Sequence, residues 1–327
     1  MKKIYKYLPI MLLLASCIAG CDEDEGMSAN ENPPTAEFSA NKIKIFQGES
    51  ISFTDLSTDN PADFYWNFGT SDTDTSTTQN PTKRYTMVGN YSVSLKVVNS
   101  FGSDSLIKTN YIQVDTLLLG EAGTVTDIDG NSYKTITIGN QVWMAENLKV
   151  THFPDGTEIP LIENDSIWGA LADNDDSPAF SYYNNLSTGS YGALYTYAAA
   201  IKAAPEGWHL PTDEEWKQLE MYIGMSQEDA DSEGWRGIDE GLKLKSSAGW
   251  SNMNGTVNFG FSALPGGYRY STNGAFYPAT YHGYWWTSTE SDGSNAYFRA
   301  LSYNTSKINR DNLRGKSFGF SVRCVKD

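Results

Sequence analysis

The chain has 327 residues, a length that predicts about two domains. Its 40 Asp and Glu residues outnumber its 24 Lys and Arg residues, and the formal net charge of −16 argues against a nucleic-acid partner, because phosphate binding needs clustered cations. Aromatic residues make up 13 % of the chain and glycines number 29, so the composition indicates a globular, β-rich protein and excludes a disordered one.

The first 20 residues have the pattern of an export signal. Lys2 and Lys3 give a positive start, and the apolar run at residues 7–14 is too short to span a bilayer. Two strings, residues 14–17 and 18–21, resemble the lipobox of bacterial lipoproteins, in which the chain is cut before a cysteine that receives lipid. The uncharged stretch continues up to Cys21, so we predict a signal peptide at residues 1–20 and lipidation of Cys21. An ordinary secretory signal with incidental cysteines is the alternative.

Residues 21–34 are predicted to form a lipidated acidic tether. The acidic run at residues 22–25 resembles the surface-export signal of lipoproteins from Bacteroidota-type bacteria. This resemblance implies an outer-membrane protein that faces the cell exterior and touches the membrane only through its lipid. A plain solvated linker is the alternative.

Residues 35–116 show short alternating strands separated by turn residues, which predicts an all-β unit. Phe64, Trp66 and Phe68 are two residues apart, so they are expected to share one face, and Trp66 is expected in the core. The strings at residues 80–85 and 89–99 resemble the PKD domain. That resemblance implies an immunoglobulin-like sandwich that serves as a spacer, and we assign no chemistry to it.

Residues 117–327 are predicted to form a second domain with strands and few helices. Asp129-Gly130 and Gly139-Asn140 predict hairpin turns. Residues 192–201 are apolar at helical spacing and predict a helix. Thr212 with Glu215 forms the sequence pattern of a capping box, which predicts the start of a second helix that Gly224 ends. A third helix is expected within residues 237–245.

The end of the chain alternates apolar and polar residues from Phe318 to Cys324, which predicts a strand with Cys324 on its apolar face. We therefore expect Cys324 to be a buried, inert thiol. Since the other two cysteines, Cys17 and Cys21, lie at the start of the chain, no disulfide framework is expected in the folded part.

Several strings of this second domain resemble the Fibrobacter succinogenes major paralogous domain. They lie, in the order of that family, at residues 123–130, 141–148, 191–195, 204–212, 260–269, 284–289 and 319–325. The segment from Trp208 to Trp216 also looks like the formylglycine-generating enzyme superfamily, which implies an α+β C-type-lectin-like fold. The oxidase chemistry of that superfamily is not carried over, because it needs reactive cysteines that this domain lacks. The expected fold class is therefore multidomain: an immunoglobulin-like sandwich followed by a C-type-lectin-like domain.

A catalytic role is not expected for this chain. His152, His209 and His282 are its three histidines, and no nucleophile-elbow sequence or zinc-type histidine pair occurs. The 40 acidic residues guarantee chance pairs, so no glycosidase pair is assigned.

A calcium ion is the one cofactor that the sequence suggests. Asp173, Asp175 and Asp176 supply hard oxygen ligands within one loop. The sugar-binding triplets of C-type lectins are absent, and a solvated acidic loop is the favoured interpretation.

The predicted ligand-binding residues are large aromatic side chains and a histidine that fall between the family strings. Exposed aromatic residues on loops favour a binding surface, and their flat rings suit the C–H faces of sugars. The residues are Trp168, Tyr270, Phe276, Tyr277, Tyr281 and His282. The alternative is that these rings cover the thin core of a loop-rich fold.

Together these patterns predict an outer-membrane surface lipoprotein that binds an extracellular polysaccharide through its second domain. The alternative function is structural or adhesive, with this domain contacting another protein or a host matrix. A row of exposed aromatic rings favours a glycan, whereas a broad apolar patch with a polar rim favours a protein.

Overall fold

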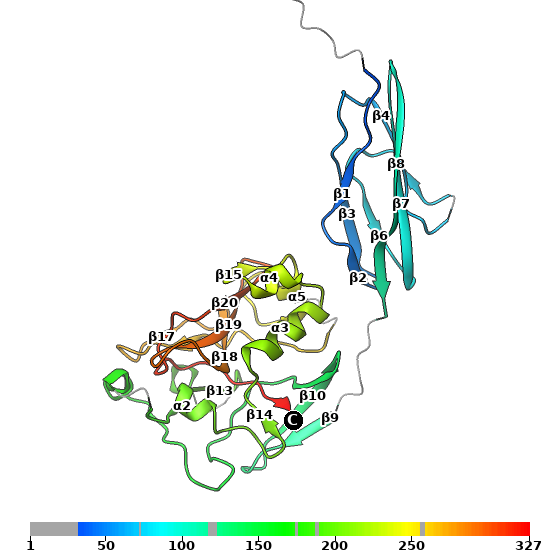
Figure 1. Ribbon diagram of the computed structural model, residues 1–327. Coiled ribbons are helices and arrows are strands. Elements are labelled where there is room, and N and C mark those ends of the chain that lie inside the picture. Colours follow the sequence, from blue (N-terminus) through cyan, green and yellow to red (C-terminus); the bar gives the residue numbers. More distant parts are fainter. Residues whose placement is uncertain (1–31, 72, 117–122, 174–175, 187–189, 256–258) are drawn as a thin grey trace, which may run out of the picture. The chain divides into compact units, whose positions relative to one another are not determined.

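The computed structural model describes residues 32–71, 73–116, 123–173, 176–186, 190–255 and 259–327. These residues form two compact units (Figure 1). The first comprises the chain up to residue 43 and residues 48–114, and the second comprises residues 44–47 and 115–327, although the strand at residues 44–46 pairs into a sheet of the first. The predicted signal peptide, Cys21 and residues 21–31 of the tether lie outside the described residues. None of the helices in the described ranges is long and apolar enough to cross a membrane.

The first unit consists of two antiparallel sheets, as the alternating pattern predicts. The strand order is β1-β3-β6 in one sheet and β2-β8-β7-β4-β5 in the other. The strands are β1 (Phe38–Ala40), β2 (Lys44–Phe46), β3 (Ser50–Asp55), β4 (Asp63–Asn67), β5 (Thr75–Ser76), β6 (Thr82–Arg84), β7 (Gly89–Asn99) and β8 (Gly102–Asp115).

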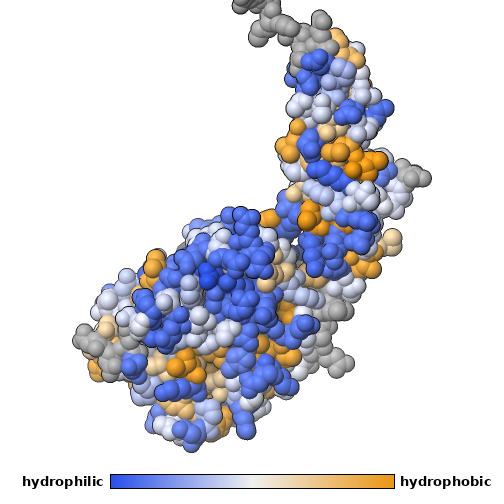
Figure 2. Space-filling view, viewed as in Figure 1, coloured by the Kyte–Doolittle hydropathy of each residue, from blue (hydrophilic) through white to orange (hydrophobic). Residues whose placement is uncertain are grey.

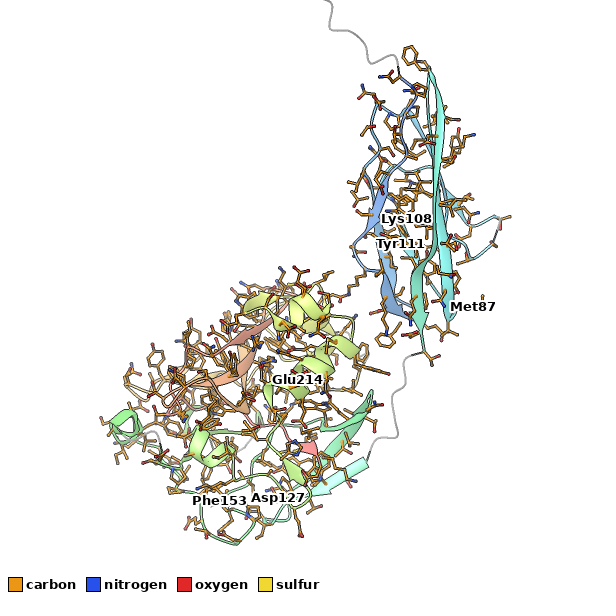
Figure 3. The ribbon with its side chains drawn as sticks, in the orientation of Figure 1. Met87, Lys108, Tyr111, Asp127, Phe153 and Glu214 are labelled. Carbon is orange, nitrogen blue, oxygen red and sulfur yellow. The ribbon has the colours of Figure 1, made fainter. Side chains whose placement is uncertain are left out.

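The core of the first unit lies between these sheets. Trp66 on β4 is fully buried, and its ring lies 5.1 Å from that of Phe38 on β1 and 5.5 Å from that of Phe53 on β3. Phe64 and Phe68 are buried as well, which confirms the predicted common face. At the surface, Lys108 lies over the ring of Tyr111, and Figure 3 labels both side chains. This unit therefore uses its large aromatic residues for packing.

The second unit contains two larger sheets and two short hairpins. The orders are β14-β21-β11-β10-β9 and β15-β20-β19-β18 in the sheets, and β12-β13 and β16-β17 in the hairpins. The strands are β9 (Gly123–Thr126), β10 (Ser132–Ile138), β11 (Gln141–Met144), β12 (Phe180–Tyr182), β13 (Ala193–Tyr195), β14 (Trp208–His209), β15 (Gly234–Arg236), β16 (Tyr268–Arg269), β17 (Phe276–Tyr277), β18 (His282–Glu290), β19 (Ala296–Ser302), β20 (Ile308–Asp311) and β21 (Val325–Lys326).

The helices of the second unit are short. They are α1 (Asp165–Gly169), α2 (Tyr197–Ala200), α3 (Asp213–Tyr222), α4 (Gln227–Asp231) and α5 (Glu240–Leu244), with 3₁₀ turns η1 (Ala170–Asp173) and η2 (Tyr183–Asn185). The capping box at Thr212 is confirmed, since its hydroxyl accepts from the Glu215 amide and the Glu215 carboxylate accepts from the Thr212 amide. The predicted helix at residues 192–201 is wrong in its first half, because residues 193–195 pair with β12 as a strand.

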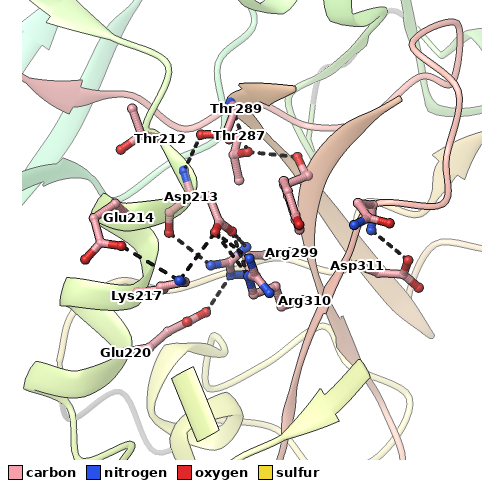
Figure 4. Close-up of polar contacts among 12 residues, drawn as sticks. Thr212, Asp213, Glu214, Lys217, Glu220, Thr287, Thr289, Arg299, Arg310 and Asp311 are labelled. Carbon is pink, nitrogen blue, oxygen red and sulfur yellow. Dashed lines mark hydrogen bonds and ion pairs between the residues drawn. The ribbon is translucent and has the colours of Figure 1, made fainter. Parts of the chain in front are cut away.

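Helix α3 is fixed to the four-stranded sheet by buried ion pairs (Figure 4). Asp213 accepts from Arg299 on β19 at 2.7 Å and from Arg310 on β20 at 2.8 Å. Glu220 lies on the same face of the helix, two turns after Asp213. It accepts from Arg299 at 2.7 Å and from Arg236 at 2.5 Å. Because Glu220 and the arginines are withdrawn from solvent, this network is expected to hold the sheet and helix in one arrangement.

The outer surface of the second unit agrees with the acidic composition. Hydrophilic residues cover most of its visible face, and hydrophobic residues form small patches there (Figure 2). The interior is aromatic: Trp286 on β18 and Phe298 on β19 lie opposite each other, and Phe320 packs against both. Cys324 lies in this core, and burial raises the pKa of its thiol, as the predicted inert role requires.

Candidate functional site

The predicted aromatic ligand-binding residues gather around the short hairpin of β16 and β17. In this hairpin Tyr268 lies opposite Tyr277, and Arg269 lies opposite Phe276. Since side chains of opposed residues in an antiparallel pair share one face, the hairpin has a tyrosine face and an arginine face. The two faces have different environments.

The arginine face is packed inward. The Arg269 guanidinium lies between the rings of Trp168 and Phe276, at 4.5 and 4.7 Å from their centroids. It also pairs with Asp165 at 2.8 Å and donates to the Gly274 carbonyl at 2.8 Å. Phe276 therefore contributes packing to a buried cation, although part of its ring stays accessible.

The prediction that Trp168 lies exposed on a loop is wrong. Trp168 is fully buried on α1, whose first turn is capped by the Asn164 side chain accepting from the Ile167 amide. This turn directs the indole inward over Arg269, so no ligand can stack on it. Trp168 is buried rather than exposed because this one-turn helix directs its indole inward. The local sequence does not show which way such a short helix points its side chains.

The tyrosine face is open to solvent. Tyr277 is 45 % exposed, and its ring lies parallel to that of Tyr268, which is 5 % exposed, at 4.7 Å between centroids. Tyr270 lies on the same side of the hairpin and is half-buried, with its ring 5.0 Å from Phe318. The buried rings of Tyr268 and Phe318 thus support the accessible phenol groups of Tyr277 and Tyr270.

The open face continues to the start of β18. Tyr281 is 41 % exposed and its ring contacts that of Tyr303 at 4.8 Å, edge to face. His282 lies between the two pairs, 5.6 Å from Tyr277 and 6.1 Å from Tyr303. We call the set Tyr270, Tyr277, Tyr281, His282 and Tyr303 the aromatic surface.

Tyr303 is a member of this surface that sequence reasoning missed. It follows β19, and the strand register that places Ser302 opposite His282 brings it beside the predicted residues. The signal in the sequence is weak, because Tyr303 stands outside the aromatic segment at residues 268–286. Only the pairing of β18 with β19 shows the contact.

His282 carries a buried, unpaired polar atom within the aromatic surface. The Nδ1 atom of His282 is buried without a hydrogen-bond partner among the described residues, and burial lowers the pKa of this imidazole. A neutral imidazole with an unused nitrogen thus lies beside the phenol groups of Tyr277 and Tyr281. Buried polar atoms normally have partners, so this unpaired Nδ1 is an exception.

The candidate calcium site lies largely beyond what the structure describes. Asp175 and the side chain of Asp173 are outside the described residues, whereas Asp176 is described and exposed. Within the described ranges, no three His, Cys, Asp or Glu residues are grouped so that they could hold a metal ion. Calcium binding by this loop stays a prediction.

The three histidines have different surroundings. His152 pairs with Asp129 at 2.6 Å, and His209 lies between Glu215 and Asp327 at 2.8 and 2.6 Å. His282 belongs to the aromatic surface. His152 Nδ1 also lies 3.0 Å from the Thr151 hydroxyl, and both ring nitrogens of His209 face carboxylates.

Comparison with protein families gives two matches. Residues 136–326 match the Fibrobacter succinogenes major domain, and residues 31–114 match the PKD domain. The first match covers more than half of the chain. A search of curated proteins gives no match.

Several solved structures resemble the first unit, which is a two-sheet sandwich. The PKD1 domain of the Vibrio cholerae metalloprotease PrtV is 36 % identical, with 26 % of this chain and 100 % of that chain covered and a TM-score of 0.22. The PKD1 domain of Vibrio anguillarum Epp is 27 % identical, with 26 % and 98 % covered and a TM-score of 0.22. A structure described as carbohydrate-binding modules of the beta-sandwich super family is 19 % identical, with 39 % and 75 % covered and a TM-score of 0.24. At these TM-scores the likenesses carry no argument about what this chain binds.

Proposed function

Because the chain belongs to the Fibrobacter succinogenes major domain family, we propose that it is a surface-anchored binding protein whose second unit binds an extracellular polysaccharide. Cys21 would carry the lipid anchor in the outer membrane, and the acidic tether and the PKD-like unit would space the second unit from the membrane. The C-type-lectin-like fold suggested by the segment from Trp208 to Trp216 is part of the same proposal. The sequence patterns support the anchor and the location.

The observation that carries the proposal is the aromatic surface. Tyr277 and Tyr281 are the exposed rings, and each is held by a neighbouring ring, Tyr268 or Tyr303. Flat, fixed rings suit the C–H faces of sugars, while phenol groups suit sugar hydroxyls. Tyrosine combines both properties, which is why it is common in binding surfaces.

The magnitude of the contact favours an extended ligand. A sugar ring that covers about 50 Å² of one phenol gains about 1 kcal/mol from apolar burial. One such contact is too weak for specific binding, because association itself costs several kcal/mol. A polysaccharide that covers Tyr277 and Tyr281 together meets this requirement better than a single sugar.

A glycan-array screen of residues 30–327 tests the proposal, run once with calcium and once with a chelator. We expect polysaccharide hits that the double variant Tyr277→Ala/Tyr281→Ala loses. The chelator arm shows whether a metal ion takes part in the contact. A blank array with a folded protein would contradict the proposal and favour contact with another protein.

A further inference from the structure

A second concave site lies on the second unit, apart from the aromatic surface. It is a cavity of about 380 Å³ between the turn that follows β9 and the segment that follows α2. Ile128, Val150 and Ala204 form apolar walls, and Asp127, His152 and Glu206 supply the polar groups. Figure 3 labels Asp127. None of these residues belongs to the aromatic surface.

Asp127 brings a buried negative charge to this cavity. Only 7 % of its surface is exposed, and its carboxylate accepts from the Tyr133 hydroxyl at 2.6 Å and from the Asn131 side chain at 3.0 Å. Backbone amides of Asp129 and Asn131 also donate to it. All these donors are neutral, and no lysine or arginine in the described ranges forms an ion pair with it. A buried carboxylate that lacks a countercharge favours a cation in the adjacent space.

His152 and Glu206 are further polar residues that line this cavity. His152 faces Asp129 through its Nδ1 atom at 2.6 Å, so its Nε2 atom is the nitrogen that remains for a ligand. Burial acts to raise the pKa of Asp129, but hydrogen bonds from Thr151 and His152 outweigh it and hold that pKa below its usual value. Glu206 is exposed and forms no ion pair within the described part of the chain. Two carboxylates, Asp127 and Glu206, thus line a cavity with apolar walls, and Asp129 holds His152 at its edge.

Lys149 lies near Tyr133, which donates to Asp127, but Lys149 does not pair with the Asp127 carboxylate in the described structure. Its ammonium is 6.0 Å from the centroid of the Tyr133 ring and makes no ion pair there. A divalent metal ion also fits poorly, because the described residues hold no cluster of three metal-binding groups. What remains is a ligand that joins one positive charge to an apolar body.

We propose that this cavity binds a small organic cation, a primary ammonium group on a short apolar chain. The ammonium donates to the Nε2 atom of His152 and to the Glu206 carboxylate, near the negative charge of Asp127, and the hydrocarbon covers Ile128, Val150 and Ala204. The acidic character of the whole chain, with its net charge of −16, favours the approach of such a cation. The proposal is independent of polysaccharide binding.

Three four-carbon probes separate charge from shape: butylammonium, butan-1-ol and butyrate. Each is titrated into the whole chain, with binding followed by calorimetry and by ligand-observed NMR. We expect butylammonium to bind, added salt to weaken it, and the alcohol and the carboxylate to bind at least about tenfold more weakly. Equal binding of the alcohol, or no binding by butylammonium up to its solubility limit, would overturn the proposal.

Two variants locate the site. Glu206→Gln removes an exposed charge without touching the core, and we expect it to weaken butylammonium binding about three- to tenfold. Ala204→Leu fills the cavity and should abolish binding. Glu228→Gln, an exposed glutamate on α4, is the matched control and should change nothing. Unchanged affinity in both Glu206→Gln and Ala204→Leu would place any bound amine elsewhere and refute the assignment.

A lysine side chain of a peptide presents the same chemistry as butylammonium. A tripeptide with a central lysine is therefore titrated beside the free amine. We expect the free amine to bind more tightly than the peptide, because the apolar walls enclose the ligand. That result would identify the natural ligand as a small molecule that carries the ammonium group. Tighter binding of the peptide would overturn that part of the proposal and assign the cavity to a protein partner.

Discussion

Tyr277 lies parallel to Tyr268, with the ring planes at 18° and the centroids 4.7 Å apart. The lower ring is buried and the upper ring is nearly half exposed, so the core fixes the orientation of a surface side chain. A ring that is already fixed loses little conformational freedom when a ligand covers it. This arrangement gives the aromatic surface a defined shape before any ligand arrives.

Replacing Tyr277 and Tyr281 with Ala tests whether that surface binds polysaccharide. Each exposed ring is expected to contribute about 1 kcal/mol, so the double variant should lose about tenfold or more in affinity. The melting temperature should stay near its original value, because exposed side chains contribute little to folding. Binding is measured on an immobilised glycan, and unfolding by calorimetry.

Tyr65→Ala is the matched control for this experiment. Tyr65 is 51 % exposed on β4 of the first unit, and its loss should leave polysaccharide binding unchanged. A large drop in melting temperature for Tyr277→Ala would instead assign that ring to the core.

Trp168→Ala should destabilise the second unit strongly. The indole is fully buried against Arg269, and truncating a buried tryptophan costs about 3–5 kcal/mol in the free energy of unfolding. Ile167→Ala, the exposed neighbour on α1, should change that free energy by less than about 0.5 kcal/mol. Denaturant unfolding measures both. Loss of ligand binding with unchanged stability in Trp168→Ala would show that the indole acts as a binding platform after all.

Glu220→Gln tests the buried ion network. The substitution leaves Arg236 without its carboxylate partner in an interior site, whereas Arg299 keeps Asp213, and breaking such a buried pair costs about 3–5 kcal/mol. Glu214→Gln on the same helix is the control, because Glu214 is exposed and its contact with Lys217 at 3.8 Å is a surface pair. Chemical denaturation of both variants checks the prediction, and equal stabilities would mean that the network contributes nothing net.

His209 should give the second unit a pH-dependent stability. Burial acts to lower the pKa of His209, but hydrogen bonds to Asp327 and Glu215 outweigh it and raise that pKa. The stabilising contribution is therefore fully present below the unfolded pKa of about 6.5, and it is lost as the pH rises through the raised folded value. His209→Gln should remove this contribution, so the natural chain should exceed the variant in stability more at pH about 6 than at pH about 9.

His282 provides an internal contrast for the pH experiment. Burial lowers the pKa of His282, so its contribution is present above the unfolded pKa and is lost as the pH falls. His282→Gln should accordingly change the pH profile with the opposite sign. Urea unfolding at both pH values measures the two variants, and profiles that move in the same direction would contradict the assigned surroundings.

Local patterns in the sequence were sufficient for several elements. The two hairpin turns at Gly130 and Gly139, the capping box at Thr212 and the helix within residues 237–245 depend on short-range chemistry, and each is present in the structure. Trp66 was predicted in the core of a two-sheet unit and lies there. These features are encoded within a few residues of one another.

Features that depend on distant partners could not be predicted. Residues 193–195 form a strand because β12 pairs with them, although their composition favours a helix. Arg323 was expected on the polar face of a strand, yet it is fully buried and donates to Asn147 at 2.9 Å and to the Ser262 carbonyl at 3.0 Å. Tyr303 joins the aromatic surface through a strand register alone. In each case a contact across many residues outweighs the local preference.

The position of β21 in its sheet sets the order in which the second unit can be completed. This strand, at residues 325–326, lies between β11 and β14, so two early strands of the unit are joined only by the last strand in the sequence. Ribosomes extend a chain at about 5–20 residues per second, and pairings between distant segments form slowly. The sheet therefore stays open until synthesis has passed residue 326.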